Sequence, residues 1–426
     1  MRLFYTTVLW LLMPYVFLRL LWRARKQPEY LDHIEERFGI YSEKNDRPLI
    51  WLHAVSVGET RAAQTLVAKL LSSFPLHQIL LTHTTPTGRK AGEKLFGESV
   101  LRVYLPYDYP FAINKFLRHF QPKLGILMET EIWFNLIHSC HSTDIPLLLL
   151  NARMSEKSSK GYMRFTRLTR VTLGKLAAIA AQTNEDAERL KMLGGVNVSV
   201  MGNLKFDIEP PAPMLELGKQ FRERFGAGRK ILLAASTRDG EEELLLEVLE
   251  RLRIPGLLLV LVPRHPQRFS IVANLLEQRG FSFQRRSNSR VVPTEIQVVL
   301  GDSMGEMFGY YAAADLAFIG GSLLPLGGQN LIEACAVGTP VLVGPYTFNF
   351  AEVTQLAVKA GAALQVEDSD GLIKAIQNLF GNPDTLLEMR RQCDGFVRSN
   401  RGATEKSLQL VTNILNKRRF NITNHP

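Results

Sequence analysis

A glutamate stands near the start of the chain where a strand, a turn and a helix are expected to meet. The segment Pro48–Leu71, PLIWLHAVSVGETRAAQTLVAKLL, has an apolar run of strand length at Leu49–His53, then Gly58 and Glu59, and apolar residues at helical spacing from Thr60. Glu59 therefore lies at the carboxyl end of a strand, where open α/β sheets bind their ligands. A carboxylate there can act on a bound ligand, or it can only complement the helix dipole. This segment alone leaves both interpretations open.

A second group of residues that could do chemistry lies in the C-terminal half. Gly320–Glu352, GGSLLPLGGQNLIEACAVGTPVLVGPYTFNFAE, contains a glycine-rich loop that leads to a helix expected to begin near Gln329–Asn330. Exposed N–H groups at such a start can hold a phosphate, and Glu333 can accept hydrogen bonds from ribose hydroxyls. Pro263–Pro266 ends a strand, and Met304–Glu306 is expected to begin a helix. The three segments fall at strand carboxyl ends, which favours a ligand site, although ordinary loop glycines and helix caps explain each one separately.

Strand and helix patterns alternate on both sides of a proline-rich break at Asp207–Pro213. This alternation predicts α/β architecture with two mostly parallel, doubly wound sheets, each in a Rossmann-like domain. The strand–turn–glutamate pattern of the first domain returns at Arg229–Leu252. The expected strands are Leu49–His53, Ile79–Thr82, Leu101–Leu105, Leu124–Met128, Leu147–Asn151, Ala177–Gln182 and Val198–Met201, then Arg229–Ser236, Leu257–Val262, Ile296–Leu300, Leu316–Ile319 and Val341–Val343.

The same patterns divide the chain into five segments. We expect an N-terminal anchor at 1–26, a first domain at 27–206, a linker at 207–228, a second domain at 229–395 and a helical segment at 396–426. Ligand pockets favour domain interfaces, so we expect a cleft that both domains face.

The first residues have the length and composition of a membrane anchor. Leu3–Leu18 carries no charge, which approaches the ~20 residues needed to span a bilayer. Pro14 and Arg19 interrupt the segment, so it is expected to span the membrane or to lie in its interface; a helix buried against the first domain is the alternative. Basic residues follow it, so the domains are predicted to be cytoplasmic; these residues are Arg19, Arg23, Arg25 and Lys26.

Composition narrows the classes of partner. The 426 residues carry a formal net charge of +10, which indicates a nucleic acid, a membrane surface or a phosphorylated substrate. No nucleic-acid-binding module is recognisable. The segment Arg153–Lys175 holds seven basic residues and one acid, and Lys160, Arg164 and Arg167 are expected on one helix face. This face is suited to anionic lipid or substrate phosphates, and a merely solvated face is the alternative.

Several signatures are absent or weak. The sequence has no Walker lysine loop, no G-x-G-x-x-G and no G-x-S-x-G. Asp368 and Asp370 form its one Asp-x-Asp, but they precede a helix, so helix capping explains them better than metal binding. The three cysteines are far apart and fit neither a disulfide framework nor a zinc site. No metal and no cofactor is expected.

Five motifs, taken together, resemble one family. They are HAVSVGE at His53–Glu59, METE at Met128–Glu131, GNLKFD at Gly202–Asp207, PRHP at Pro263–Pro266 and GPYTFNFAE at Gly344–Glu352. In this order and spacing the chain resembles, almost end to end, the bacterial 3-deoxy-D-manno-octulosonic acid (Kdo) transferases of lipid A assembly. It departs from the family at Trp133-Phe134-Asn135, where Trp-Pro-Asn is usual. It departs again at 328–333, where Gly-Gln-Asn-Leu-Ile-Glu replaces Gly-His-Asn-Pro-Leu-Glu.

The resemblance implies a GT-B glycosyltransferase that moves Kdo from CMP-Kdo to the 6′ hydroxyl of a lipid A precursor, with inversion, at the cytoplasmic face of the cell inner membrane. Its first domain would bind the acceptor and its second the nucleotide sugar. Glu59 would be the base, and Glu129 and Lys205 would support the transition state. The residues expected to hold CMP are Arg264, His265, Met304, Gly305, Glu306, Asn330, Leu331, Ile332 and Glu333.

Two alternatives have a basis in the same patterns. A GT-B enzyme that uses a UDP-sugar would have the same two-domain architecture and would be protected from unfolding by UDP rather than CMP. A membrane-anchored protein that binds a nucleotide sugar without turnover would not depend on Glu59. Anionic lipids of the inner membrane are expected partners, and nucleic acid is not.

Overall fold

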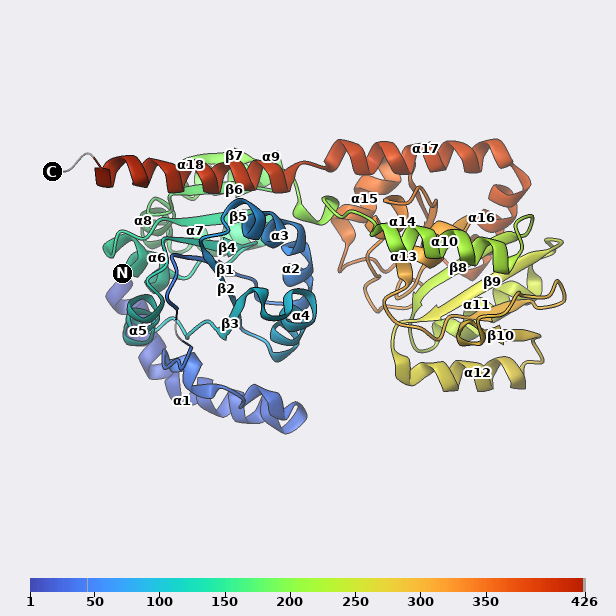
Figure 1. The fold of residues 1–426 in the computed structure, drawn as a ribbon, viewed down its shortest axis with the longest axis horizontal. Coiled ribbons are helices and arrows are strands. Elements are labelled where there is room, and N and C mark those ends of the chain that lie inside the picture. Colours follow the sequence, from blue (N-terminus) through green and yellow to red (C-terminus); the bar gives the residue numbers. More distant parts are fainter. Residues whose placement is uncertain (44, 424–426) are drawn as a thin grey trace. The chain divides into compact units, whose positions relative to one another are not determined.

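The chain folds into two compact units, each built on one parallel sheet. The computed structural model describes residues 1–43 and 45–423, with the backbone alone for 418–423. One unit is Met1–Asp207 together with the chain from Arg401 onward, and the other is Ile208–Asn400. Each has a seven-stranded sheet with helices on both faces (Figure 1). The predicted α/β class with two Rossmann-like units is confirmed.

The first sheet has the strand order β3-β2-β1-β4-β5-β6-β7, and all its strands are parallel. β1 lies in the middle, with Leu52 paired to Leu81 on one side and to Ile126 on the other. Both faces are covered, which explains why the strands are continuous apolar runs. The strands are β1 (Leu49–His53), β2 (Gln78–His83), β3 (Leu101–Tyr104), β4 (Leu124–Met128), β5 (Leu147–Ala152), β6 (Ala178–Ala181) and β7 (Val198–Val200).

Alternate side chains of these strands enter two separate cores. Ile50 and Leu52 pack with helices α3 and α18, whereas Leu49 and Trp51 pack with α5, α6, α8 and α9. The helices of this unit are α1 (Arg2–Lys26), α2 (Val57–Ala62), α3 (Gln64–Ser73), α4 (Pro86–Phe96), α5 (Pro110–Phe120), α6 (Phe134–Ser142), α7 (Glu156–Met163), α8 (Thr166–Leu173), α9 (Asn184–Met192) and α18 (Ala403–Thr423).

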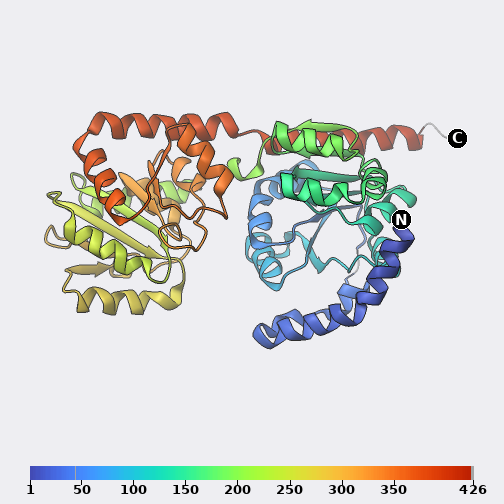
Figure 2. The same cartoon turned by 180° about the vertical axis from the view of Figure 1, so that it is seen from behind.

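Helix α1 is docked on the first unit through its first three turns. Tyr5 donates to Asp108 Oδ2 at 2.9 Å, and Tyr109 donates to the carbonyl of Leu9 at 2.9 Å. Trp10 packs on the ring of Tyr109 at 5.4 Å. The helix contains Pro14 and is visibly bent (Figure 2), as proline inside a helix commonly causes. Of the described residues, α1 is the one helix long and apolar enough to cross a membrane.

The second sheet has the order β10-β11-β9-β8-β12-β13-β14, again with all strands parallel. The sequence patterns missed its two edge strands, β10 and β14, because each has only three residues and neither is fully buried. The strands are β8 (Lys230–Thr237), β9 (Leu257–Pro263), β10 (Phe283–Arg285), β11 (Val298–Leu300), β12 (Leu316–Ile319), β13 (Val341–Val343) and β14 (Ala363–Gln365).

The helices of the second unit include one inside the expected linker. Residues 207–228 contain α10 (Ala212–Phe225), which packs on α13 through the buried Phe221 and Tyr310. The prolines do not prevent this helix, because they stand at its start, where the backbone N–H groups have no partner within the helix. The other helices are α11 (Glu241–Arg251), α12 (Phe269–Gln278), α13 (Met307–Ala313), α14 (Ile332–Cys335), α15 (Ala351–Lys359), α16 (Ser369–Gly381) and α17 (Pro383–Asn400).

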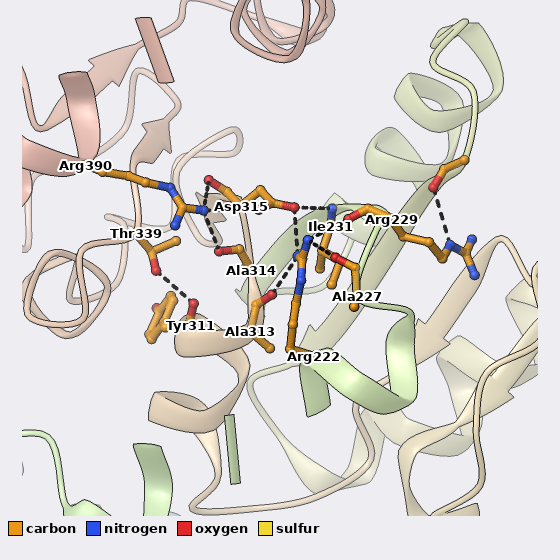
Figure 3. Close-up of polar contacts among 11 residues, drawn as sticks. Arg222, Ala227, Arg229, Ile231, Tyr311, Ala313, Ala314, Asp315, Thr339 and Arg390 are labelled. Atoms are coloured by element: carbon orange, nitrogen blue, oxygen red, sulfur yellow. Dashed lines mark hydrogen bonds and ion pairs between the residues drawn. The ribbon is translucent and has the colours of Figure 1, made fainter. Parts of the chain in front are cut away.

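A polar network ties α10 and α17 to the amino-terminal edge of the second sheet (Figure 3). Asp315, just before β12, accepts hydrogen bonds from Arg222 of α10 at 2.9 Å and from Arg390 of α17 at 3.1 Å. Its carboxylate also accepts the backbone N–H of Ile231 in β8 at 2.9 Å. The second unit begins at Ile208 and includes all of α17, and the chain returns to the first unit at Arg401.

Candidate active site

Glu59 lies in the first turn of α2, shortly after β1 ends, where the sequence predicts a glutamate at the helix start. Ser56 caps α2, and the Glu59 carboxylate accepts hydrogen bonds from Val55 N at 2.8 Å and from Ser56 Oγ at 2.9 Å. The pKa of Glu59 is raised to about 7, mainly by burial; these two hydrogen bonds lower it, and the charges of Glu129 and Glu131 contribute to the rise. The side chain is only half-buried, so near neutral pH the carboxylate is partly ionised and accessible to a proton donor.

Glu129 and Lys205 come together beside this carboxylate. Glu129 follows β4 directly and has a left-handed backbone with φ 58°. Lys205 lies in the 3₁₀ turn Leu204–Phe206, and its Nζ is 3.5 Å from Glu129 Oε1. Both side chains keep about a quarter of their surface exposed, 26% for Glu129 and 28% for Lys205. The three residues predicted to be catalytic are therefore neighbours at the carboxyl edge of the first sheet.

Polar residues at neighbouring strand ends fix the turn that carries Lys205. Asn151, at the end of β5, accepts the backbone N–H of Leu204 at 3.0 Å, and Asn203 accepts that of Lys205 at 3.0 Å. Gln182, after β6, donates to the carbonyl of Asn151 and accepts from Asn203, both at 2.9 Å. The motif search missed Asn151 and Gln182, although both occur at carboxyl ends of predicted strands.

A third carboxylate, Glu131, belongs to the same edge and was not predicted. Trp133 donates to it at 2.5 Å, and its pKa is raised, mainly by burial. His53 Nε2 is 4.0 Å from Glu131, but burial and the neighbouring His83 lower the pKa of His53 to about 3. His53 is therefore neutral at physiological pH, and this contact is not an ion pair.

The second unit groups basic residues after β9. The Arg264 backbone N–H donates to the carbonyl of Thr237 at 3.0 Å, which fixes the start of the Arg264-His265 loop. The pKa of His265 is lowered by burial and then by the charges of Arg238, Arg264 and Arg268. The loop therefore carries positive charge that can attract an anionic ligand, although Arg268 is ion-paired with Asp239 and Glu242.

Glu306 is held differently from what the sequence predicts. Helix α13 begins at Met307, so Met304–Glu306 forms the loop before it. The Glu306 carboxylate accepts hydrogen bonds from Arg286 at 2.9 Å and from Ser303 at 2.5 Å. Gly305 has φ +84°, which a residue with a side chain rarely adopts. The loop can offer a ligand its backbone groups, whereas much of the Glu306 carboxylate is already engaged.

The segment Asn330–Glu333 also differs in detail. Helix α14 begins at Ile332, not near Gln329, and Asn330 Oδ1 accepts the N–H of Ile332 at 3.1 Å. The side chains of Leu331 and Ile332 are fully buried, so a ligand could meet only their backbone. The buried phenol of Tyr311 has its pKa raised by burial, raised further by Glu333 and lowered by Arg264. Arg264 and Glu333 therefore lie near the same side chain.

Two other predicted features have clear outcomes. Asp368 caps α16 by accepting the N–H of Gly371 at 2.8 Å, so the capping interpretation is confirmed. The prediction of a single basic helix face is wrong, because helix α7 ends before Arg164 and a new helix, α8, begins at Thr166. Lys160 pairs with Glu156 at 2.6 Å. A hollow of about 550 Å³ lies there, lined by Glu156, Lys157, Lys160, Gly161 and Arg164.

Solved structures of the same architecture identify the fold. A glycosyltransferase from Rickettsia africae has a TM-score of 0.57 and 16% identity, over 87% of this chain and 99% of that one. UDP-GlcNAc 2-epimerase from Neisseria meningitidis has the same TM-score and identity, over 87% and 100%. The fold is therefore the GT-B-like fold of glycosyltransferases with two parallel sheets.

Sequence relatives define the family. The family model described as 3-deoxy-D-manno-octulosonic-acid transferase (kdotransferase) matches residues 32–208. The 3-deoxy-D-manno-octulosonic acid transferase of Haemophilus influenzae is 37% identical over 417 residues, and that of Bordetella pertussis is 40% identical over 423 residues. Each match covers 96% of this chain and 98% of the relative. The chain belongs to the Kdo transferase family and is a glycosyltransferase.

Proposed function

We propose that this enzyme moves Kdo from CMP-Kdo to the 6′ hydroxyl of a lipid A precursor, lipid IVA, with inversion at the anomeric carbon. The observation that carries the proposal is the Glu59 carboxylate, half-buried at a strand end with its pKa raised to about 7. A sugar hydroxyl is a poor nucleophile, and a general base works best when its pKa is close to the working pH.

Glu59, Glu129 and Lys205 of the first unit divide the reaction between them. Glu59 takes the proton of the acceptor hydroxyl as the oxygen attacks the anomeric carbon, and CMP leaves with the electrons of the broken bond. Glycosyl transfer passes through a cationic sugar, whose charge Glu129 offsets. Lys205, 3.5 Å from Glu129, attracts the carboxylate of Kdo.

The strand-end loops of the second unit hold the nucleotide in this proposal. Arg264 supplies positive charge to the phosphate, and His265, whose pKa is lowered, donates a hydrogen bond to it as a neutral imidazole. Glu333 accepts hydrogen bonds from the ribose. The proposed contacts of the remaining residues are mainly through the backbone, because two of their side chains are buried and a third is paired with Arg286; these residues are Met304, Gly305, Glu306, Asn330, Leu331 and Ile332.

The acceptor is a lipid, and α1 supports a membrane location. Its first turns are hydrogen-bonded to the first unit at Asp108 and Tyr109, contacts that would be broken if the helix crossed a bilayer from its first residue. We therefore assign α1 to the cytoplasmic interface of the inner membrane, with its outward apolar side chains in the lipid. These exposed side chains include Leu3, Phe4, Leu11, Leu12, Leu18 and Trp22. The basic residues around Arg164 attract anionic lipid or the acceptor phosphates.

The test is transfer itself. The full-length protein in detergent is incubated with CMP-Kdo and lipid IVA, and the product is analysed by mass spectrometry. We expect the acceptor to gain the mass of Kdo with the wild type and to remain unchanged with Glu59→Gln. Thermal melts with CMP and with UDP run in parallel. Protection by UDP alone, or equal product from the variant, would overturn the proposal.

A further inference from the structure

Asp207 forms hydrogen bonds that link the two chain segments that connect the units. The chain leaves the first unit after Asp207 and re-enters it at Arg401. The Asp207 side chain is largely buried, and its Oδ1 accepts the N–H of Gly402 at 2.6 Å. Its Oδ2 accepts the N–H of Thr404. One carboxylate therefore caps the first turn of α18, where unpaired N–H groups favour negative charge.

The same residue ends the turn that carries Lys205. Asp207 N donates to the carbonyl of Leu204 at 3.1 Å, and Thr65 of α3 donates to the carbonyl of Asp207 at 3.0 Å. The front of the turn is fixed by the amides of Asn151 and Asn203, as described above. Its rear is held by Asp207, which forms hydrogen bonds with Thr65 of α3 and with the first turn of α18.

We propose that Asp207, by capping α18, positions Lys205 against Glu129, so that the C-terminal helix supports the active site as well as the fold. Lysine has a long, flexible side chain, and the direction of its ammonium depends on where its backbone is held. A displacement of about 1 Å in a reacting group can cost about 10²-fold in rate. The proposal rests on the proposed role of Lys205 in Kdo transfer.

The carboxylate is required because it accepts two N–H groups at once. In Asp207→Asn only one side-chain oxygen remains, and the NH₂ group would face the N–H of Gly402 or Thr404. In Asp207→Ala both bonds are lost. A matched control is Glu405→Gln, which removes the exposed ion pair of α18 with Lys69 of α3 and does not touch residues 204–207.

The experiment measures kcat, KM for both substrates, CMP affinity and thermal stability of the full-length variants. Asp207→Ala should lower kcat about 10- to 100-fold with CMP affinity unchanged. Asp207→Asn should lose less, and Glu405→Gln should stay within about twofold of the wild type. A double variant separates positioning from general destabilisation. Once Lys205→Ala has removed the lysine, adding Asp207→Ala should cost no further activity, because coupled residues are not additive.

The outcomes separate this inference from the proposed function. If Lys205→Ala retains full turnover, the catalytic role of Lys205 fails and the inference fails with it. If Lys205→Ala is inactive but Asp207→Asn and Asp207→Ala have wild-type kcat, Asp207 does not position the lysine and Kdo transfer is unaffected. Additive losses in the double variant would likewise overturn the inference. Should Asp207→Ala not fold, the same cycle is run with Asp207→Asn.

Discussion

In each unit the first strand is followed by a turn and a helix that has a glutamate in its first turn, but the two glutamates have different surroundings. In the second unit, Glu241 follows β8 as Glu59 follows β1, but it is fully buried. Its carboxylate accepts three backbone N–H groups, from Gly321 at 2.5 Å, from Leu323 at 3.0 Å and from Arg238 at 3.0 Å. Glu59 accepts one backbone N–H and one hydroxyl and is half-buried.

The difference shows what leaves the carboxylate in this turn able to exchange a proton near neutral pH. The Glu241 carboxylate is saturated by donors and closed to solvent, so it anchors the glycine-rich loop to α11. The Glu59 carboxylate is incompletely satisfied, lies near two other carboxylates and has its pKa raised to about 7 by burial. The repeated motif therefore predicts a shared fold, and the chemistry depends on how many donors each site provides.

The largest expected effect is on turnover, from Glu59→Gln. The amide keeps the size of the side chain but cannot take a proton, so the transfer rate should fall by about 10²- to 10⁴-fold. CMP affinity, measured by calorimetry, should remain near the wild-type value because the loops proposed to bind the nucleotide belong to the second unit. A variant within about tenfold of wild-type turnover would remove Glu59 from the base role.

Glu241→Gln should affect stability instead. The NH₂ group would face a backbone N–H that has no other acceptor, and a buried unsatisfied donor costs about 1–3 kcal/mol. In a unit of this size that lowers Tm by roughly 2–4 °C for each kcal/mol. Melting curves and turnover of the folded enzyme measure the two effects. Wild-type stability combined with a large loss of kcat would mean that the two glutamates do not differ as described.

The pH dependence sharpens the comparison further. Glu59 must be ionised to act as the base, so kcat/KM should rise as pH increases through about 7. Its folded-state pKa lies above the ordinary value of 4.5, so between about pH 4.5 and 7 the unfolded state has lost the proton that the folded state keeps. Raising the pH through this interval therefore lowers the contribution of Glu59 to the free energy of unfolding. Melts of the wild type and Glu59→Gln should diverge across it, and parallel curves would contradict the raised pKa.

The smallest expected effect is that of a chelator, which should leave the initial transfer rate unchanged. Magnesium prefers free carboxylate oxygens, but Glu241 is saturated and Glu306 is held by Arg286 and Ser303. Within residues 1–43 and 45–423 no group of three His, Cys, Asp or Glu side chains could hold a metal. The assay uses detergent-dispersed lipid so that metal effects on aggregation do not intrude. Loss of turnover restored by magnesium would require these carboxylates to act as ligands.

The sequence predicted the strands best where they are buried on both faces. Leu49–His53, Leu124–Met128, Leu316–Ile319 and Val341–Val343 have the bounds that apolar runs indicate. The two strands it missed, β10 and β14, lie at sheet edges, where a short strand needs no long apolar run. The basic segment was wrongly predicted to form one helix face for a related reason. Charge spacing alone does not reveal that one helix ends before Arg164 and a second, short helix follows.

For this protein the sequence by itself determined the α/β class, the two Rossmann-like units, the apolar N-terminal helix and the positions of Glu59 and Glu129 just after strands. These follow from local periodicity, because each strand or helix records its own burial in its residue pattern. Only the tertiary structure decided that Asn151 and Gln182 fix the Lys205 turn, and that Glu241 is saturated while Glu59 is not. It also brought Gly402 and Thr404 to Asp207 across 195 and 197 residues of chain. Hydrogen-bond partners so distant in the chain leave no periodic trace, so they can be identified only once the strands and helices are packed.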